Sequence, residues 1–483
     1  MTHPTRRLSA GRLTTMLGSP DPDRPAYAWL ADGVRGLVAN GRVLHGTALP
    51  SERDLVGAIG LSRTTVSRAY SELRDRGYAT ARVGAGTVVQ VPGGPAAGGG
   101  EPLPLGGFGP AEGATAVDLT CAAPAAPLGL AAVYEEAMDQ LPAYIGGMGY
   151  FPLGLPVLRQ AIARTYERRG LATDPSQIVV TAGALAGVAA VARAVLAPGA
   201  RALAESPSYP NSVISLRHHG VRVAPVPIGA EGTDLDAVSG ALRSVAPAAM
   251  LCLPDFHNPT GTLLGNAGRE RWARELDRHG AVGIVDETSA ALWLDAEPDV
   301  VPMAAFSDRI VTIGSASKSH WGGLRLGWIR APRPLAAGLA RVRMSLDLGA
   351  PVLEQLVLAR LLETGAGLSA ETRGGLRGNR DWLLAELGAR LPGWEARRPE
   401  GGLSLWWNLP APRSTALADE AARGGVLLAP GSTFAVGDHG LERWIRTPYA
   451  LGRESLEAAV PVIARAWDRV HGKAPRTGGP GTP

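Results

Sequence analysis

Lys318 is the residue of this sequence with the clearest potential for chemistry, because lysine is almost absent from the chain. The 483 residues include 46 arginines but only two lysines, Lys318 and Lys473. Arginine can replace lysine where only charge matters, but it cannot supply a deprotonated amine that attacks a carbonyl group. Lys473 lies in the polar tail HGKAPRTGGPGTP, whereas Lys318 follows the strand-like run RIVTIGS. We therefore expect Lys318 to be a nucleophile.

An amine that condenses with a carbonyl group suits pyridoxal 5′-phosphate (PLP), to which Lys318 would bind as an internal aldimine. Such a site also needs an acid at the pyridine nitrogen, a ring to stack on the pyridine, a donor to the 3′-oxygen and an arginine for a substrate carboxylate. The residue types that meet these needs, in the same order, are Asp286 in IVDE, Tyr209 in SPSYPN, Asn258 in HNPTG and Arg446 in IRTPYA. We predict catalytic roles for Lys318 and Asp286, and cofactor or substrate binding for the others.

A phosphate group needs free backbone N–H groups and a positive charge. The stretch TAGALAG follows the apolar run QIVV and is typical of a helix start, where backbone amides bind anions. The residues that we expect to hold the phosphate are Gly183, Ala184, Leu185, Ser315 and Arg325. Each signal has an ordinary structural explanation, since a strand-ending aspartate often caps a turn and a tyrosine between prolines often only packs. Their combination is what favours a cofactor site.

The N-terminal part has the pattern of a DNA-binding helix-turn-helix. Apolar residues follow helical spacing on both sides of a break at residues 60–62, and Ser62 is a suitable N-cap for a second helix. The start of that helix carries side chains that reach phosphates and base edges in a major groove, namely Arg63, Thr64, Thr65, Ser67 and Arg68. The sequence VGAGT, with Gly84, then predicts a wing. A helical dimerisation module is the alternative.

The surrounding elements divide the chain into segments. We expect a flexible leader over 1–25, a winged helix-turn-helix over 26–91, a Gly/Pro-rich linker over 92–116, a larger domain over 117–472 and a flexible tail over 473–483. In the larger domain, short apolar runs alternate with helical stretches, which indicates an α/β fold with a mostly parallel sheet. From about 335 to 472 we expect a smaller α+β lobe.

Composition limits the classes of function. Residues 1–93 hold 12 arginines and 7 acidic residues, a net charge of +5 that favours a nucleic-acid partner. The sequence has no run of 18 apolar residues and no secretory signal, so we expect a cytoplasmic protein without a membrane partner. The only cysteines are Cys121 and Cys252, which fits a reducing compartment and predicts no metal site.

Two resemblances follow from these motifs. LPSERDL, SRTTV and the glycine wing resemble the GntR-type winged helix-turn-helix, which implies DNA contacts by Arg53, Arg63 and Gly84; position 67, often arginine in that family, is serine here. TAGALAG, SPSYPN, HNPTG, VDE, SASK, GLRLG and PGSTF resemble fold-type I aminotransferases over 117–472. That resemblance implies a homodimer in which Tyr150 reaches the cofactor phosphate of the other subunit.

The fusion of the two modules resembles the MocR-like subgroup of GntR regulators. One departure is that Thr288 and Ser289 stand where relatives carry a tyrosine bonded to the 3′-oxygen. We expect a PLP-dependent transcription regulator that binds an operator in double-stranded DNA and senses an amino acid or amine through an aldimine. The alternatives are an active aminotransferase with an appended DNA-binding domain, and a DNA-binding protein that uses its larger domain only to dimerise.

Overall fold

The computed structural model describes residues 7–39, 42–43, 45–82, 86–92, 117–229, 231–365, 367–437 and 440–471. Contacts within the chain define two compact units, Met1–Glu101 with Leu128–Glu136, and Pro102–Pro127 with Ala137–Pro483. Nearly all of the expected linker and all of the expected tail lie outside the described residues.

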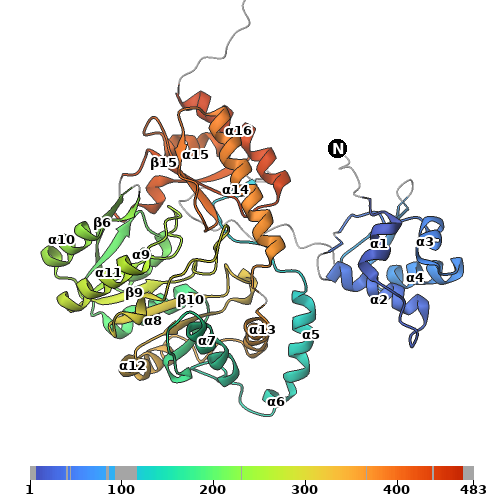
Figure 1. Cartoon of the computed structure of the whole chain (residues 1–483), viewed down its shortest axis with the longest axis horizontal. Coiled ribbons are helices and arrows are strands. Elements are labelled where there is room, and N and C mark those ends of the chain that lie inside the picture. Colours follow the sequence, from blue (N-terminus) through green and yellow to red (C-terminus); the bar gives the residue numbers. More distant parts are fainter. Residues whose placement is uncertain are drawn as a thin grey trace, which may run out of the picture. The chain divides into compact units, whose positions relative to one another are not determined.

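The N-terminal unit contains a helix-turn-helix (Figure 1, blue). Its elements are α1 (Ala10–Leu17), α2 (Ala26–Ala39), α3 (Glu52–Ile59), α4 (Arg63–Asp75), β1 (Ala79–Arg82) and β2 (Gly86–Val89). Gly60 ends α3 in the left-handed conformation, with φ of 73°, where a side chain would be strained. The Ser62 hydroxyl accepts from the Thr65 amide at 3.1 Å, so the predicted N-cap of α4 is confirmed. β1 and β2 pair antiparallel, and Gly84 at their connection lies outside the described residues.

For the described residues 7–25, the prediction of a flexible leader over 1–25 is wrong, because α1 packs into the helix-turn-helix. Leu13 is fully buried in the same apolar cluster as Val34 and Leu55. The Leu8 amide donates to the Ala48 carbonyl at 2.9 Å, and this bond fixes the entry to the helix. Ser9 caps α1 by accepting from the Arg12 amide at 3.3 Å. An eight-residue helix is marginal alone, so burial of its apolar side against α3 supplies its stability.

The large lobe of the second unit is built on an eight-stranded sheet. In spatial order the strands are β4 (Ile178–Thr181), β11 (Gly327–Arg330), β10 (Ile310–Ser315), β9 (Val282–Asp286), β8 (Ala249–Cys252), β5 (Arg201–Ser206), β6 (Arg222–Gly229) and β7 (Gly232–Thr233). The neighbours from β10 to β6 are parallel, whereas β11 and β7 pair antiparallel. The predicted mostly parallel sheet is confirmed.

Helices cover both faces of this sheet, and strand alternation determines which side chain meets which helix (Figure 1). A Cβ on Gly187 in α8 (Ala184–Val195) would lie 3.4 Å from Ile313, so Ile313 faces α8. The next residue, Gly314, lies against Trp328, whose indole donates at 3.1 Å to Tyr166 in α7 (Pro156–Arg168). The sheet therefore has an α8 face and an α7 face. The other helices of the large lobe are α9 (Pro210–His218), α10 (Leu235–Val245) and α11 (Asn266–His279).

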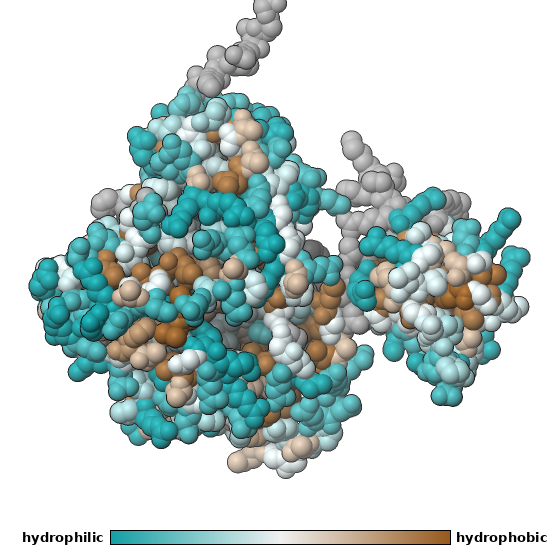
Figure 2. Space-filling model, in the orientation of Figure 1, coloured by the Kyte–Doolittle hydropathy of each residue, from teal (hydrophilic) through white to brown (hydrophobic). Residues whose placement is uncertain are grey.

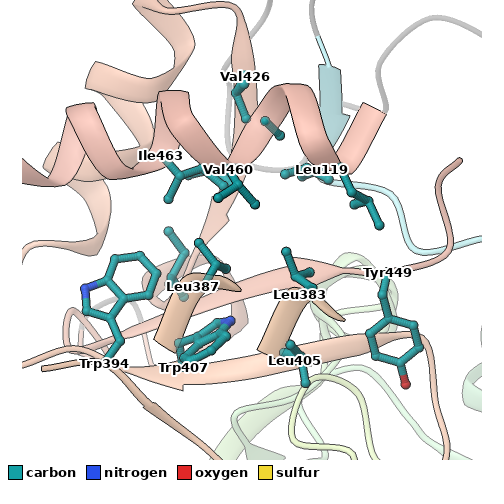
Figure 3. Close-up of a cluster of buried hydrophobic side chains, with 14 of the residues drawn as sticks. Leu119, Leu383, Leu387, Trp394, Leu405, Trp407, Val426, Tyr449, Val460 and Ile463 are labelled. Carbon is teal, nitrogen blue, oxygen red and sulfur yellow. The ribbon is translucent and has the colours of Figure 1, made fainter. Parts of the chain in front are cut away.

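The small lobe has its own five-stranded sheet and core. The strands, in order, are β12 (Glu395–Ala396), β13 (Ser404–Asn408), β15 (Trp444–Pro448), β14 (Val426–Pro430) and β3 (Val117–Leu119), and the helices are α14 (Ala370–Arg390), α15 (Ser414–Arg423) and α16 (Arg453–His471). Figure 3 shows Leu383 and Leu387 of α14 and Val460 and Ile463 of α16 pointing into one apolar cluster with Trp407 of the sheet. Each of these side chains is at most 2 % exposed.

The small lobe begins later than the predicted residue 335. Helices α12 (Arg333–Met344) and α13 (Val352–Glu363) pack on α8 and α7, respectively, and so belong to the large lobe. Ala336 and Leu339 of α12 lie in the same core cluster as Ile313. Conversely, β3 pairs parallel with β14, so residues 117–119 belong to the small lobe although they precede the large one in sequence. A further described pair of helices, α5 (Leu130–Gln140) and α6 (Pro142–Ile145), follows β3.

The described helices differ from membrane spans in length or in apolar content. None of them combines the length and the apolar content that a bilayer crossing requires. Figure 2 shows apolar side chains (brown) in separate areas between polar ones (teal) on the drawn face.

Candidate functional site

Lys318 lies in the turn directly after β10, at the carboxyl edge of the large sheet. Its Nζ atom donates a hydrogen bond to the carbonyl of Ala122, in the loop that follows β3. Burial lowers the pKa of Lys318, although Cys121 and Asp286 nearby oppose this shift. A lowered pKa leaves more of the amine unprotonated at neutral pH, which is what a nucleophilic lysine needs.

Asp286 ends β9 next to β10, where it pairs in register with Ile313. The side chain is buried, and one carboxylate oxygen accepts from the Thr288 amide at 2.9 Å. Burial raises the pKa of Asp286, whereas that amide bond and Lys318 lower it. Because Asp286 shares its register position with Ile313, it faces the α8 side of the sheet. A carboxylate held there is suited to bind a protonated ring nitrogen.

Arg446 of the small lobe is hydrogen-bonded to Asn258 of the large lobe, and its charge acts on the nearby Lys318. From β15, Arg446 donates through Nη1 to Asn258 Oδ1 at 3.1 Å and through Nη2 to the Thr120 carbonyl. Its Nε atom is buried and has no partner within the described residues. Burial lowers the pKa of Arg446 to about 10, so the guanidinium stays charged at neutral pH. A buried cation with an unused donor is suited to bind a carboxylate. Asn258 keeps its Nδ2 hydrogens for another acceptor.

Arg325 lies against the N-terminus of α8. Its Nη2 atom is 2.8 Å from the position that a Cβ on Gly183 would occupy, so a side chain at residue 183 would force the guanidinium to shift. Gly183 has φ of 90° and no side chain caps the helix. A guanidinium beside an uncapped helix N-terminus concentrates positive potential, which an anion such as phosphate would neutralise. The Ser315 hydroxyl, at the end of β10, accepts from the Ser317 amide at 3.1 Å.

One detail of the predicted phosphate cradle is wrong. The amide of Gly183 donates to the Thr181 carbonyl at 2.9 Å and is therefore already used. Among the described residues, the amides of Ala184 and Leu185 in the first turn of α8 have no such partner. The contribution of Gly183 is the space that it leaves for Arg325.

Tyr209 and Tyr150 differ in their surroundings. Tyr209 precedes α9, accepts from Asn211 at 3.1 Å, and has its pKa raised by burial and by the nearby Asp286. Tyr150 is 62 % exposed, as a residue that acts in a partner subunit would be. Ser289 lines a small pocket with Lys318 and Asn258, whereas Thr288 lines a cavity on the other side of the strand end.

Sequence reasoning missed the loop that follows β3. The carbonyls of Thr120 and Ala122 bind Arg446 and Lys318, and Cys121 lies close enough to influence the ionisation of both. Backbone acceptors have no sequence signature. The one available signal was the position of Cys121 directly after a short strand.

The predicted DNA-contacting residues fall into two groups. Arg53 and Arg63 are exposed, and neither forms an ion pair with a described residue. The other side chains have partners within the unit. The hydroxyls of Thr64 and Thr65 lie 2.9 and 2.7 Å from that of Ser62, Ser67 donates to Glu52 at 3.4 Å, and the Arg68 guanidinium lies 3.7 Å from the centre of the Tyr27 ring. Arg53 and Arg63 are therefore the arginines that remain available for phosphates.

The fold and the Lys318 site together define a protein of the fold-type I aminotransferase class. Residues 131–463 match the model of the aminotransferase class I and II family, and residues 26–89 match that of the bacterial regulatory proteins of the gntR family. The chain therefore belongs to the aminotransferase class I and II family and carries a GntR helix-turn-helix domain at its N-terminal end. The fold class predicted from the sequence is confirmed.

Similar proteins include both regulators and enzymes. The HTH-type transcriptional regulator YisV of Bacillus subtilis is 27 % identical over 93 % of this chain and 97 % of its own. Arginine–pyruvate transaminase AruH of Pseudomonas aeruginosa is 32 % identical over 71 % of this chain and 88 % of its own. The crystal structure of LysN, an α-aminoadipate aminotransferase from Thermus thermophilus complexed with N-(5′-phosphopyridoxyl)-L-leucine, is 26 % identical over 74 % of this chain and 94 % of that one, with a TM-score of 0.66. The aminotransferase fold implies dependence on PLP.

Proposed function

We propose that this protein is a transcription regulator that binds DNA through its N-terminal unit and PLP through Lys318. The observation that carries the proposal is the partly buried lysine, with its lowered pKa, in a chain that also has a helix-turn-helix with exposed arginines. Full-length similarity to YisV and to the HTH-type transcriptional regulator TauR of Rhodobacter capsulatus supports the regulatory part.

The residues of the site fit the cofactor. Lys318 would hold it covalently, Asp286 would bind its ring nitrogen, and Ala184 and Leu185 with Arg325 would hold its phosphate. Tyr209 would stack on the ring, and Asn258 Nδ2 would donate to the 3′-oxygen. Bound PLP supplies an electron sink for bonds at the carbon that carries the substrate amine.

The chain's own groups would then select and orient an amino compound. The orphaned donor of Arg446 would bind a carboxylate, and the amine of Lys318 would take or give a proton at the reacting carbon. If the ligand and the DNA each bind the two arrangements of the lobes with different affinity, ligand binding shifts the DNA affinity, and DNA binding shifts the ligand affinity by the same factor.

We further propose a homodimer. Large apolar side chains stand exposed on the segments before α7 and after α12, where a second subunit would cover them. They are Met148, Tyr150, Met344, Leu346 and Leu348, and each is at least 36 % exposed. Light scattering of the full chain should give twice the monomer mass.

An active aminotransferase is the second candidate, because Lys318, Asp286 and Arg446 suffice for the chemistry and AruH is a transaminase. The absence of a tyrosine at positions 288 and 289 argues against efficient turnover. The two candidates differ in one measurement. A transaminase recycles its cofactor when a keto acid is added, whereas a sensor changes its DNA affinity without turnover.

The scarcity of lysine gives a direct test of the cofactor site. Borohydride reduction of the PLP-loaded chain attaches the cofactor permanently to its lysine, and peptide mass spectrometry then distinguishes the only two candidates. We expect the label on Lys318 and none on Lys473. K318A should lose the visible absorbance, and K473A is the matched control. A colourless wild-type protein, or one whose operator affinity ignores every amino compound, would defeat the proposal.

A further inference from the structure

A second cavity lies on the α7 face of the large sheet, on the opposite side of the β9 end from Asp286. It has a volume of about 380 Å³, and its acidic and basic lining residues are Asp255, Glu287, Glu297, Arg168, Arg169, Arg373 and His320. We call it the α7-face cavity. The pocket at Lys318 shares none of its lining residues. Strand alternation explains the separation, because consecutive residues at the end of a strand point to opposite faces.

Two buried carboxylates in this cavity each have one oxygen without a partner. Glu287 pairs through Oε2 with Arg169 at 2.7 Å, and Asp255 pairs through Oδ1 with Arg269 at 2.7 Å. Glu287 Oε1 and Asp255 Oδ2 have no hydrogen-bond partner among the described residues. The two residues are only 6 % and 3 % exposed. A buried acceptor left unsatisfied is costly, so both oxygens favour a donor that the chain itself does not supply.

The walls around these oxygens suit a small organic cation. The rings of Trp293, Trp328 and Tyr166 line the cavity. The Arg373 guanidinium lies 3.5 Å from the centre of the Trp293 ring, so the chain's own cation already occupies one aromatic face of this wall. Aromatic faces together with unpaired carboxylate oxygens attract a positive group that also donates hydrogen bonds.

We propose that the α7-face cavity binds a small organic cation whose N–H groups donate to Glu287 Oε1 and Asp255 Oδ2. The ligand would be an alkylguanidinium or an alkylammonium ion. Because Glu287 follows Asp286 directly, the bound cation would hold the strand end that also positions the acid of the Lys318 site. The cavity is separate from the pocket at Lys318, although Ser315, which we expect near the cofactor phosphate, also lines it.

The test uses methylguanidinium and trimethylammonium with the full-length, PLP-loaded protein in a calorimetric titration. Neither cation has a primary amine that could condense with PLP, so their binding reports only on the second site. Trimethylammonium has a single N–H group and can bond only one of the two oxygens, so we expect methylguanidinium to bind more tightly. Methylurea, which is neutral and of the same shape as methylguanidinium, is the ligand control and should not bind.

Two variants test the location. E287Q removes the charge and should weaken binding about tenfold, as expected for loss of one charge-assisted hydrogen bond. Its matched control is E275Q, a glutamate that is also buried but has partners for both oxygens, Arg278 and Ser239. Ala291 is an exposed lining residue, so A291F should narrow the cavity and weaken cation binding while both carboxylates stay in place. This variant tests the location of the site if E287Q does not fold.

Three results would overturn the inference: no binding of either cation to the wild type, equal binding of methylurea, or unchanged binding in A291F and in folded E287Q. Visible absorbance recorded on the same samples reports the cofactor separately. Cation binding without a cofactor band would therefore contradict the proposed function and leave the second site standing.

Discussion

The Nη2 atom of Arg325 lies 2.8 Å from the point where a Cβ atom on Gly183 would stand. Arg325 itself has φ of 51°, in the left-handed region. The glycine and the strained arginine therefore fit each other, and together they bring a guanidinium to the first turn of α8.

G183A should weaken PLP binding at least about tenfold, or ~1.4 kcal/mol. The added methyl group displaces Arg325 and is also strained at φ of 90°. Titration of the cofactor-free protein with PLP, followed by absorbance, measures the effect. G388A is the control, because residue 388 lies within α14 and a Cβ there would have open space. Equal PLP affinity of G183A and the wild type would contradict this account of the cradle.

R446Q should weaken the binding of amino acids by about 2 kcal/mol, because it removes a charged hydrogen bond in a buried site. It should affect a plain amine much less, since an amine has no carboxylate to bind. Spectral titrations with L-alanine and with ethylamine make the comparison. R443Q is the matched control, because Arg443 lies just before β15 and bonds only Leu409 and Pro410 carbonyls among the interactions observed. Parallel losses for both ligands would mean that Arg446 acts structurally.

Glu205 should make stability depend on pH. Burial raises its pKa to about 7, so the folded protein keeps this proton at a pH where the unfolded chain has lost it. The resulting stabilisation is complete below the unfolded value of 4.5 and is lost as the pH rises to about 7, a change of about 3 kcal/mol. Urea unfolding should be measured at about pH 5 and about pH 8 for both proteins. The free energy of unfolding of E205Q, relative to that of the wild type, should be higher at about pH 8 than at about pH 5. E270Q, exposed on α11, is the control.

The neighbouring His257 has the opposite dependence, and this can hide the effect in the wild type alone. Its Nε2 atom lies 4.0 Å from Glu205, and burial lowers its pKa to about 3. Its stabilisation is present above 6.5 and is lost as the pH falls towards 3. Between pH 4.5 and 6.5 the two slopes cancel in part, so only the difference between wild type and E205Q isolates Glu205. A difference that stays constant with pH would contradict the assignment.

R63A should weaken operator binding by about 1–3 kcal/mol, whereas R68A should have a smaller effect. Arg63 is exposed at the start of α4, but the Arg68 guanidinium lies on the Tyr27 ring. R68A should instead lower the stability of the unit by about 0.5–1 kcal/mol. Fluorescence anisotropy with operator DNA, repeated over a range of salt, provides the test. Binding that ignores both salt and R63A would rule out α4 as the recognition helix.

The sequence was informative where a residue type is itself the requirement. Lys318 stands out because lysine is scarce, and Lys318 and Asp286 lie at the carboxyl ends of neighbouring strands of the large sheet, whereas Arg446 comes from β15 of the small lobe. The fold class follows from the same alternation of short apolar runs and helices.

The rest depended on contacts between segments far apart in sequence. Helix α1 is too short to stand out by periodicity, and it is stable only because Leu13 is buried against α2 and α3. The predicted boundary of the small lobe was wrong because the apolar residues of α12 and α13 indicate that these helices are packed, but do not indicate which lobe they pack on. Likewise, the hydrogen bond from the Gly183 amide to the Thr181 carbonyl joins two backbone groups, and no residue type in the sequence predicts it.

The position of β3 has a mechanical consequence. Val117 begins β3, and the carbonyl that accepts from Lys318 belongs to Ala122, five residues further along the chain. β3 is the edge strand of the small-lobe sheet and pairs with β14. A shift of this strand against β14 would therefore move the backbone acceptor of the reactive amine, so a rearrangement within the small lobe reaches Lys318 through a single hydrogen bond.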